Sequence, residues 1–148
     1  MIKIAHRGNV YGANPDLENV PEYILNAIEL GYEVEIDIWF VNGNFFLGHG
    51  EPLYPVDPFF ILDVADVAWF HCKNLEALYM FSKNFKFCNF FWHEQDDFTL
   101  TSHGIIWTYP GKPVSRLSVL VDVDLNSGVN YDTLYGICSD YVGLIGKE

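Results

Sequence analysis

The amino-acid sequence predicts an α/β fold with a parallel sheet, built either as an abbreviated barrel or as an open sheet. Short apolar segments with strand character alternate with helical segments, which is the order typical of parallel α/β domains. We count about seven strands, and the helices of the second half are very short or missing. The chain has 148 residues. A complete eightfold barrel usually needs at least ~200 residues, so a full set of strands and helices is not expected.

The first two elements are a short strand and an amphipathic helix. Residues 2–5, IKIA, are mostly apolar and predict the strand. Residues 18–31 predict the helix, because their apolar side chains recur at helical spacing. We expect Asn19 to cap this helix, with Glu22 as its capping-box partner, and Gly31 to end it.

The next segment, YEVEIDIWF at residues 32–40, alternates acidic and apolar side chains and predicts a strand. Its three acids, Glu33, Glu35 and Asp37, therefore share one face, where like charges are costly unless a positive group lies among them. The Asn-Gly pair at residues 42–43 lies between hydrophobic runs and predicts a hairpin turn.

The remaining elements continue the alternation. Further strands are expected at residues 68–73, 86–95, 105–111 and 117–124. Helical segments are expected at residues 57–68, 74–84 (capped by Asn74), 96–104 and 130–137. Residues 138–146 form a last strand or loop.

Composition excludes several classes of partner. The formal net charge is −12, so the chain should repel nucleic acids and anionic lipid surfaces. No stretch reaches the length of a membrane span, and the first residues resemble a strand more than a signal peptide. The three cysteines, Cys72, Cys88 and Cys138, form no CxxC pair and are expected to be reduced and buried in a cytoplasmic protein. Residues 1–148 are expected to form one domain.

Residues able to carry chemistry gather where the predicted strands end. In parallel α/β folds the carboxyl ends of the strands form the site. Four of the five histidines lie at such ends or at the exit of the hairpin, and one of only two arginines lies there too. These positions are His6 with Arg7 and Asn9, Glu35 with Asp37, His49, His71 with Lys73, His93 with Glu94 and Asp96, Trp107, and Asp122 with Asp124.

Taken in order, these segments resemble a known family. IAHRGN at residues 4–9, Glu18-Asn19 ahead of a helix, AIELGYEVEIDIWF at residues 27–40 and GNFFLGH at residues 43–49 are similar to the motifs of glycerophosphodiester phosphodiesterases. That family lies within the wider phospholipase-C-like phosphodiesterase superfamily. The ordered set, with its strand–helix–strand context, covers the first third of the chain and is far more specific than His-Arg alone.

The resemblance implies an abbreviated TIM barrel that hydrolyses a phosphodiester, with a glycerophosphodiester as the expected substrate. It implies a divalent metal, Mg²⁺ or Ca²⁺ with Mn²⁺ possible. Carried over by position, His6 and His49 are the acid–base pair and Arg7 binds the phosphate. Glu35 and Asp37 hold the metal.

Three departures from the family pattern affect the site. His71 stands where the family has a third acidic ligand, whereas Lys73 is retained beside it for the phosphate. An imidazole at that place shifts metal preference toward Mn²⁺ or Zn²⁺, or leaves Mg²⁺ with an extra water. Gly50 follows His49 where the family has an acid. The chain is also short, so a homo-oligomer could complete the barrel.

The chemistry of phosphodiester hydrolysis fits these residues without the family. The anionic substrate needs its charge neutralised by a metal and an arginine, whose planar fork suits phosphate oxygens. Two histidines can serve as base and acid near neutral pH. Hard oxygen ligands such as Glu35 and Asp37 suit Mg²⁺ or Ca²⁺. Trp107 is a candidate for packing against the substrate, with a core or rim position as the equal alternative.

Two other interpretations remain open on the sequence. The first is a non-catalytic module that keeps the phosphate pocket without turnover, which the short chain and the missing third acid favour. The second is a small α/β domain whose polar strand ends are coincidental; it leaves the ordered motifs unexplained. For the strand at residues 32–40, we expect Glu35 and Asp37 to face inward as ligands. Glu33 is expected to lie low in the sheet as a structural charge.

Overall fold

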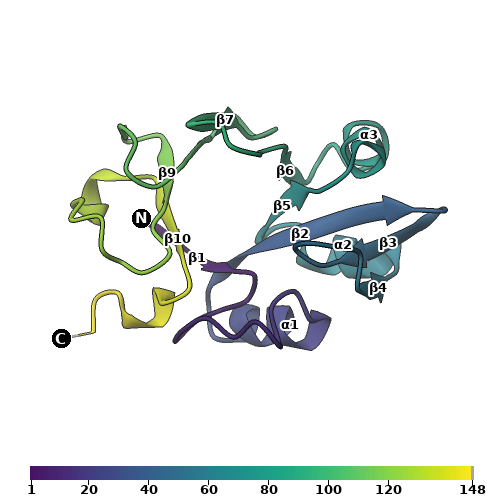
Figure 1. Ribbon diagram of the computed structural model, residues 1–148, viewed down its shortest axis with the longest axis horizontal. Helices are drawn as coiled ribbons and strands as arrows, with labels where there is room; N and C mark the ends of the chain where they lie inside the picture. Colours follow the sequence, from purple (N-terminus) through teal and green to yellow (C-terminus); the bar gives the residue numbers. More distant parts are fainter. Residues whose placement is uncertain (148) are drawn as a thin grey trace.

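In a computed structural model, which describes residues 1–147, ten strands form one mixed sheet that curls into a half-barrel (Figure 1). The strand order is β4-β3-β2-β1-β10-β9-β8-β7, while β5 pairs with β2 and β6 with β5. The sheet therefore bends so that β9 and β10 lie on one side and β5 and β6 on the other (Figure 1).

The strands are short except for β2. Their bounds are β1 Ile2–His6, β2 Glu33–Val41, β3 Asn44–Leu47, β4 Tyr54–Val56, β5 Ala68–Cys72, β6 Asn89–Phe91, β7 Phe98–Leu100, β8 Ile106–Thr108, β9 Ser118–Val121 and β10 Gly136–Ser139. The α-helices are α1 Pro21–Glu29, α2 Pro58–Val64 and α3 Leu75–Asn84, and two 3₁₀ turns are η1 Tyr131–Thr133 and η2 Val142–Leu144.

The predicted fold class is confirmed in its α/β character and its barrel-like curl, but the prediction of a parallel sheet is wrong in part. Seven strands form parallel pairs, namely β1, β2, β5, β6, β8, β9 and β10. Strands β3, β4 and β7 pair antiparallel with their neighbours. Their connections are too short for the crossover that a parallel pair requires, so the chain can only turn back.

Three local predictions are wrong. Residues 130–137 were expected to be helical, but they contain only the 3₁₀ turn η1 and the first two residues of β10. Residues 96–104 were expected to be helical, but they contain β7, which pairs with β8. A three-residue strand is too short for its period to be recognised. Asn19 does not cap α1, because the N-cap is Val20 and no side chain bonds the first turn. The Asn42-Gly43 hairpin is confirmed, with positive φ angles of 50° and 80°.

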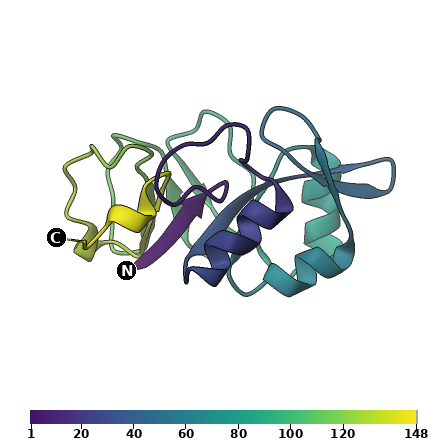
Figure 2. The same ribbon diagram turned by 90° about the horizontal axis from the view of Figure 1, so that it is seen from below.

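The helices cover one half of the sheet. Val34, Ile36 and Ile38 of β2 point outward and are fully buried, in one cluster with Ile24 of α1 and Phe81 of α3. Figure 2 shows α1, α2 and α3 together on that half, in purple to teal, while the later part of the chain is mostly loops and short strands. The apolar stripe of β2 thus meets the helices, as predicted.

A second, smaller cluster fills the inside of the curl. Side chains on a strand alternate between faces, so residues two apart along β1, β2, β5, β6, β8, β9 and β10 point inward together. One layer consists of Ile4, Trp69, Phe91, Trp107, Val119 and Cys138, from six strands. Trp107 packs against Phe91 and Trp69, with ring centroids 4.7 and 5.8 Å apart. This layer forms the floor beneath the polar strand ends.

The sheet has no strand ladder between β6 and β7 within residues 1–147. Single hydrogen bonds bridge this gap: the Ser102 N–H donates to the Phe90 carbonyl at 2.8 Å, and the Thr99 hydroxyl donates to the Trp92 carbonyl at 2.9 Å. The strand pairing therefore leaves the barrel open between β6 and β7.

Two further expectations concern the whole chain. Cys72, Cys88 and Cys138 are buried and free, as predicted. Within the described residues, none of the helices combines the length and apolar character needed to cross a bilayer.

Candidate functional site

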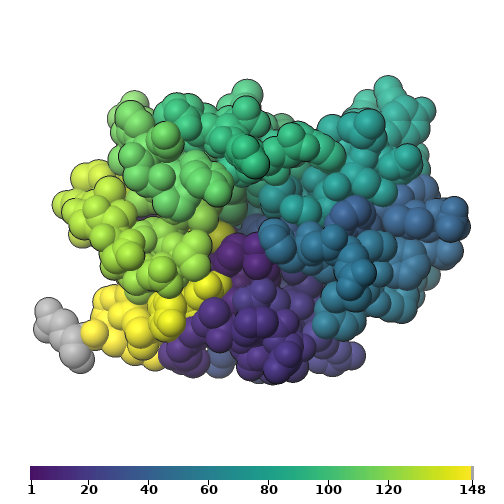
Figure 3. Space-filling model, viewed as in Figure 1, coloured from purple at the N-terminus to yellow at the C-terminus, as the bar shows by residue number. Residues whose placement is uncertain are grey.

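A pocket of about 310 Å³ opens at the carboxyl ends of the parallel strands, where the sequence predicted a site. The purple beginning of the chain reaches the centre of this face, between the blue hairpin region and the green later segments (Figure 3). The pocket is lined by His6, Arg7, Glu35, His49, His71, Lys73, His93, Glu94, Trp107, Tyr109, Pro110, Val121 and Val123. Most of the predicted site residues are among them, and Asp37 lies directly beneath.

Glu35 and Asp37 point inward from β2 and are almost fully buried, with 2% and 1% of their surface exposed. The sheet register sets their neighbours, because Glu35 is paired with His6 of β1 and Asp37 with His71 of β5. Buried carboxylates need compensating partners. Each of these two has positive groups within 4 Å, which answers how the acids tolerate each other.

Asn19 holds Asp37 in place instead of capping the helix. Its side-chain amide donates to Asp37 Oδ2 at 2.9 Å, and its side-chain oxygen accepts the Asp37 backbone N–H at 3.0 Å. Asn19 is fully buried and has a φ of 63°, a left-handed conformation that asparagine tolerates. Its backbone N–H also donates to the Arg7 carbonyl at 3.1 Å, so one residue ties the ends of β1 and β2 together.

Arg7 lies between the two acids of β2 and a third acid. Its Nε is 3.2 Å from Asp37 Oδ2, and its Nη1 donates to Glu18 at 3.2 Å. The φ of Arg7 is 54°, so the chain turns sharply after β1 and directs this side chain across the strand ends. Lys73, just after β5, places its Nζ 3.9 Å from Asp37 Oδ1. Both predicted phosphate-binding cations therefore border the pocket.

His71 is oriented by the carbonyl that its outer nitrogen contacts. Its Nε2–H donates to the His93 carbonyl at 2.8 Å, and its ring stacks on Phe91 at 4.9 Å. Its Nδ1 faces the acids, 3.3 Å from Asp37 and 3.5 Å from Glu35. Burial alone would lower the pKa of His71, but the contacts with Asp37 and Glu35 outweigh it and raise the pKa to about 9.

One oxygen of the site has no hydrogen bond. Asp37 Oδ1 is buried and lacks a hydrogen-bond partner within the described chain, although His71 Nδ1 and Lys73 Nζ are near. Burial would raise the pKa of Asp37, but its contacts with His49 and His71 and the charge of Arg7 lower it well below the usual range. A buried, ionised carboxylate oxygen that lacks a well-formed hydrogen bond is a natural ligand for a cation.

The donor set fits a divalent ion. One ligand atom each from Glu35, Asp37 and His71 lie within 4.8 Å of one another. A histidine whose second nitrogen donates to a backbone carbonyl is the usual arrangement of a metal-bound imidazole. Two carboxylates with one imidazole suit Mn²⁺ as well as Mg²⁺. These residues are the three that the sequence suggested as ligands.

His6 forms a buried pair with Asp140, just after β10. Its Nδ1 donates to Asp140 Oδ1 at 2.8 Å, which leaves Nε2 directed toward Glu35, 4.0 Å away. Burial lowers the pKa of His6, but the hydrogen bond to Asp140 and the charge of Glu35 outweigh it, so the pKa is raised. The hydrogen bonds from His6 and Asn9 overcome the effect of burial on Asp140 and lower its pKa. Asp140 is therefore an ionised acceptor that fixes the His6 tautomer.

His49 lies at the mouth of the pocket, after β3. Its side chain is 52% exposed, and its Nε2 accepts a hydrogen bond from Arg7 Nη2 at 3.3 Å, so that nitrogen is unprotonated. Its Nδ1 is 3.5 Å from Asp37 Oδ2. Gly48 before it has a φ of 152°, and a Cβ there would lie 2.0 Å from the Glu51 carbonyl. Only glycine allows the tight turn that presents His49.

Glu33 is separate from this cluster, as expected. It lies at the other end of β2 and accepts the Trp69 indole N–H at 2.6 Å. Burial raises its pKa, and the bond from Trp69 offsets part of that rise. The stripe of three acids thus divides between the two ends of the curl.

The remaining candidates are placed as follows. Trp107 is only 4% exposed and packs in the interior layer, while its edge borders the pocket. His93 is buried, and its Nε2 donates to the Asp96 carbonyl at 2.6 Å. Glu94 is exposed at the rim. His103 lies on the surface, where its Nε2 donates to the Phe87 carbonyl, and takes no part in the site.

Three residues that support the site, Asn9, Glu18 and Asp140, were assigned no role from the sequence. Asn9 is fully buried, and its side-chain amide donates to Glu18 at 3.0 Å and to Asp140 at 2.8 Å. Asn9 therefore links Glu18, which binds Arg7, to Asp140, which binds His6. The Tyr23 hydroxyl in turn donates to Asn9. Glu18 was quoted only as part of a motif, and Asp140 lies 134 residues from His6. Nothing in one sequence pairs residues that far apart.

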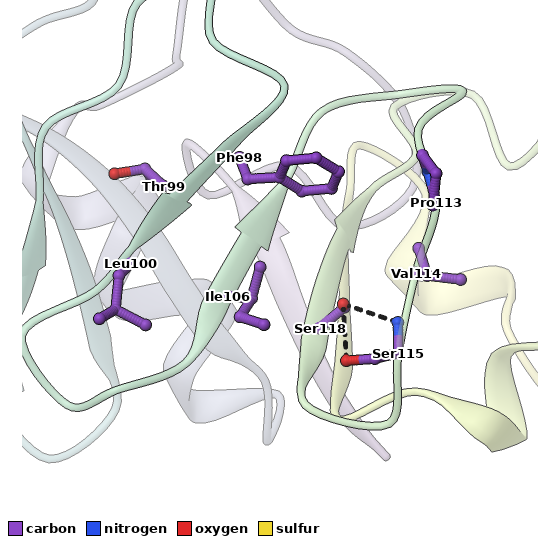
Figure 4. A pocket seen from close by; sticks show the side chains of 8 residues that line it. All are labelled: Phe98, Thr99, Leu100, Ile106, Pro113, Val114, Ser115 and Ser118. Carbon is purple, nitrogen blue, oxygen red and sulfur yellow. Dashed lines mark hydrogen bonds between the residues drawn. The ribbon is translucent and has the colours of Figure 1, made fainter.

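A larger apolar groove of about 490 Å³ lies elsewhere, on the outside of β7 and β8, next to residues 113–118 (Figure 4). Its lining includes Phe98, Leu100 and Val114 but no ionisable side chain. Size therefore does not identify the chemical site here; the convergence of charged groups does.

Comparison with known proteins gives no assignment: no protein-family model, curated protein or solved structure matches the chain.

Proposed function

We propose that the chain is a metal-dependent phosphoric diester hydrolase, with a glycerophosphodiester as the expected substrate. The observation that carries the proposal is the convergence of two histidines, an arginine, a lysine and a buried carboxylate pair on one pocket. The likeness of its motifs to glycerophosphodiester phosphodiesterases supports the same conclusion. An abbreviated member of that family would keep the strand ends that carry chemistry and lose the outer helices.

The binding part of the proposal rests on Arg7 and Lys73. Both cations border the pocket beside the acids of β2, and a phosphodiester anion needs such groups in a chain of net charge −12. Arg7 is held by Glu18, so its guanidinium is already oriented before substrate binds. Glu35, Asp37 and His71 would hold the metal ion, which when bound would neutralise charge on the phosphate.

The acid–base part rests on His6 and His49. In the hydrolysis, an attacking hydroxyl from water or from the substrate forms a bond to phosphorus, and the bond from phosphorus to one ester oxygen breaks. His49 suits the base, because its ring borders the pocket and its Nε2, which accepts from Arg7, carries an electron pair that can take a proton. His6 suits the acid, because Asp140 raises its pKa and its Nε2 can pass a proton to the leaving alkoxide.

A second candidate is a phosphate-binding module without turnover. The observation that favours it is the close contact of Arg7 and His71 with Asp37, which compensates the carboxylates without an added ion. Tight binding of phosphate or a phosphodiester without product would support this function over hydrolysis.

His6→Ala and His49→Ala test the catalytic assignment. Each variant should abolish metal-dependent hydrolysis while the far-ultraviolet circular dichroism spectrum remains that of the wild type. His103→Ala is the matched control, because this surface histidine takes no part in the site, and it should keep full activity. Full activity in both site variants would overturn the assignment.

Two properties of the whole protein are part of the proposal. A cytoplasmic location is supported by the three free, buried thiols, which are typical of a reducing compartment. The second property is a homo-oligomer, in which a second copy would complete the barrel where the strand pairing is open, between β6 and β7. Sedimentation equilibrium would give the assembly state.

A further inference from the structure

The pocket has two chemically different walls. His6, Arg7, Glu35, His71 and Lys73 lie on or directly after β1, β2 and β5, which are neighbours in the sheet. The other wall comes from β8 and β9 and the residues after them, which are not hydrogen-bonded to those three strands. The wall where the phosphate would bind is therefore charged. The wall on the other side of the pocket is built from different strands and different types of residue.

The second wall is mainly apolar. It consists of Trp107, Pro110, Val121 and Val123, with the Tyr109 side chain at the exposed rim. Val119 and Val121 are inward positions of β9, and Val123 lines the pocket two residues after Val121, just beyond the end of the strand. This segment thus presents valines on the pocket side, where the ends of β1 and β2 present His6 and Glu35.

The polar residue between Val121 and Val123 is Asp122, whose carboxylate already has hydrogen-bond partners. Asp122 is buried and accepts the backbone N–H groups of Asn126 and Ser127, at 3.0 and 3.1 Å. It also accepts the Tyr131 hydroxyl at 2.8 Å. This carboxylate therefore holds the loop that follows β9 and leaves Val121 and Val123 as the pocket surface of this segment.

We propose that the phosphodiester carries a short apolar ester group, alkyl or aryl, that lies against Trp107, Val121 and Val123. The inference rests on the proposed function, since it takes the phosphate to lie at Arg7 and Lys73. Binding of an apolar group against this aliphatic wall is favourable, because it removes apolar surface from water. A hydroxyl at the same place would lose its hydrogen bonds to water. The pocket of about 310 Å³ has room for a phosphate and a short group.

The test compares two synthetic diesters of glycerol 3-phosphate that differ by one terminal hydroxyl, the n-butyl ester and the 4-hydroxybutyl ester. The two leaving alcohols are chemically alike at the ester oxygen. A difference in rate or affinity between the esters therefore reflects contact with the apolar wall and not the quality of the leaving group. Diester loss is followed by phosphorus NMR with the Mn²⁺-loaded protein, and binding of both esters is measured by calorimetry. The butyl ester should be preferred about tenfold or more, in kcat/KM and in binding.

The matched variants are Val123→Thr and Val114→Thr, because threonine has the shape of valine and adds a hydroxyl. In the pocket, Val123→Thr should reduce the preference for the butyl ester over the 4-hydroxybutyl ester several-fold. On the outer groove, Val114→Thr should leave the preference unchanged.

The two readouts separate this inference from the proposed function. Hydrolysis of both esters at equal rates would overturn the apolar subsite and leave the hydrolase proposal standing. Preferential binding of the butyl ester without hydrolysis would support the subsite and contradict turnover. Preference for the hydroxybutyl ester, or binding of neither ester, would overturn the subsite.

Discussion

The three acids of β2 differ in what surrounds them, although they share one face of one strand. Glu35 and Asp37 lie among His6, Arg7 and His71, whereas Glu33 accepts a hydrogen bond from the Trp69 indole at the far end of the curl. Period-2 alternation places all three inward, but position along the strand decides which end of the curl each one reaches.

Glu35→Gln and Asp37→Asn should each weaken binding of Mn²⁺ or Mg²⁺ by at least roughly 100-fold, because each removes an ionised ligand oxygen. Glu33→Gln is the matched control and should bind the ion as the wild type does, since it lies at the opposite end of the strand. Isothermal titration calorimetry on chelator-treated protein measures all three. Equal affinities across the set would contradict the ligand assignment.

His71 should make the metal-free protein sensitive to pH. Its pKa is raised from 6.5 to about 9, so the charged ring stabilises the fold fully below pH 6.5, and this contribution is lost as pH rises to about 9. The Tm of chelator-treated protein should therefore fall across that range. The fall should be smaller in His71→Gln and unchanged in the surface variant His103→Gln.

Parallel pH profiles of Tm for the wild type and His71→Gln would contradict this origin of the pH effect. An added metal ion should compete with the Nδ1 proton, so metal affinity should rise with pH over the same range.

At the scale of elements, the site depends on the loop between β1 and α1. That loop carries Arg7, Asn9, Glu18 and Asn19, and each bonds a group in or next to the site. The sequence pattern suggested a capped helix here, because Asn19 and Glu22 have the spacing of a capping box. The buried carboxylate of Asp37 offered Asn19 a stronger partner than the helix end did, and that partner lies 18 residues away.

Asn19→Ala should destabilise the fold by about 2 kcal/mol more than Asn42→Ala, because it leaves the buried Asp37 N–H without an acceptor. Asn42 is the matched control, since it also has a positive φ but lies in an exposed hairpin turn. Urea unfolding measures both free energies. Equal losses would mean that Asn19 matters only for its backbone conformation.

Elements with long or distinctive patterns could be predicted, and short ones could not. The β2–β3 hairpin follows from Asn42-Gly43, and α3 follows from its Asn74 cap and apolar spacing. The three-residue strand β7 gives no usable period, and its pairing with β8 depends on tertiary contacts. The direction of β3, β4 and β7 likewise follows from connection length more than from the residues of each strand.

At the scale of the whole molecule, parallel pairing gathers the site. Strand ends that lie far apart in the sequence meet at one edge of the curl, so listing the polar residues after each predicted strand finds most of the pocket. His6, Arg7, Glu35, His49, His71 and Lys73 were all identified in this way. Asn9 was placed at the end of the first strand without a role, and Asp140 was not identified, because their importance comes from bonds between side chains of distant segments.

The small number of helices is also a whole-molecule property. Within the described residues, α1, α2 and α3 cover one half of the sheet (Figure 2). On the other half, apolar side chains such as Phe98 and Leu100 of β7 are exposed. The floor of aromatic side chains inside the curl supports the strand ends independently of those helices. A short chain can therefore keep a polar pocket without the full outer ring.

The most direct test of the account is metal-dependent turnover by the full chain. Purified protein is incubated with a chromogenic phosphodiester and Mg²⁺, Ca²⁺ or Mn²⁺ in turn, then with excess EDTA, and then with the ion restored. The account predicts product release that EDTA stops and the added ion recovers. The absence of release with all three ions, or release that EDTA leaves unchanged, would contradict it.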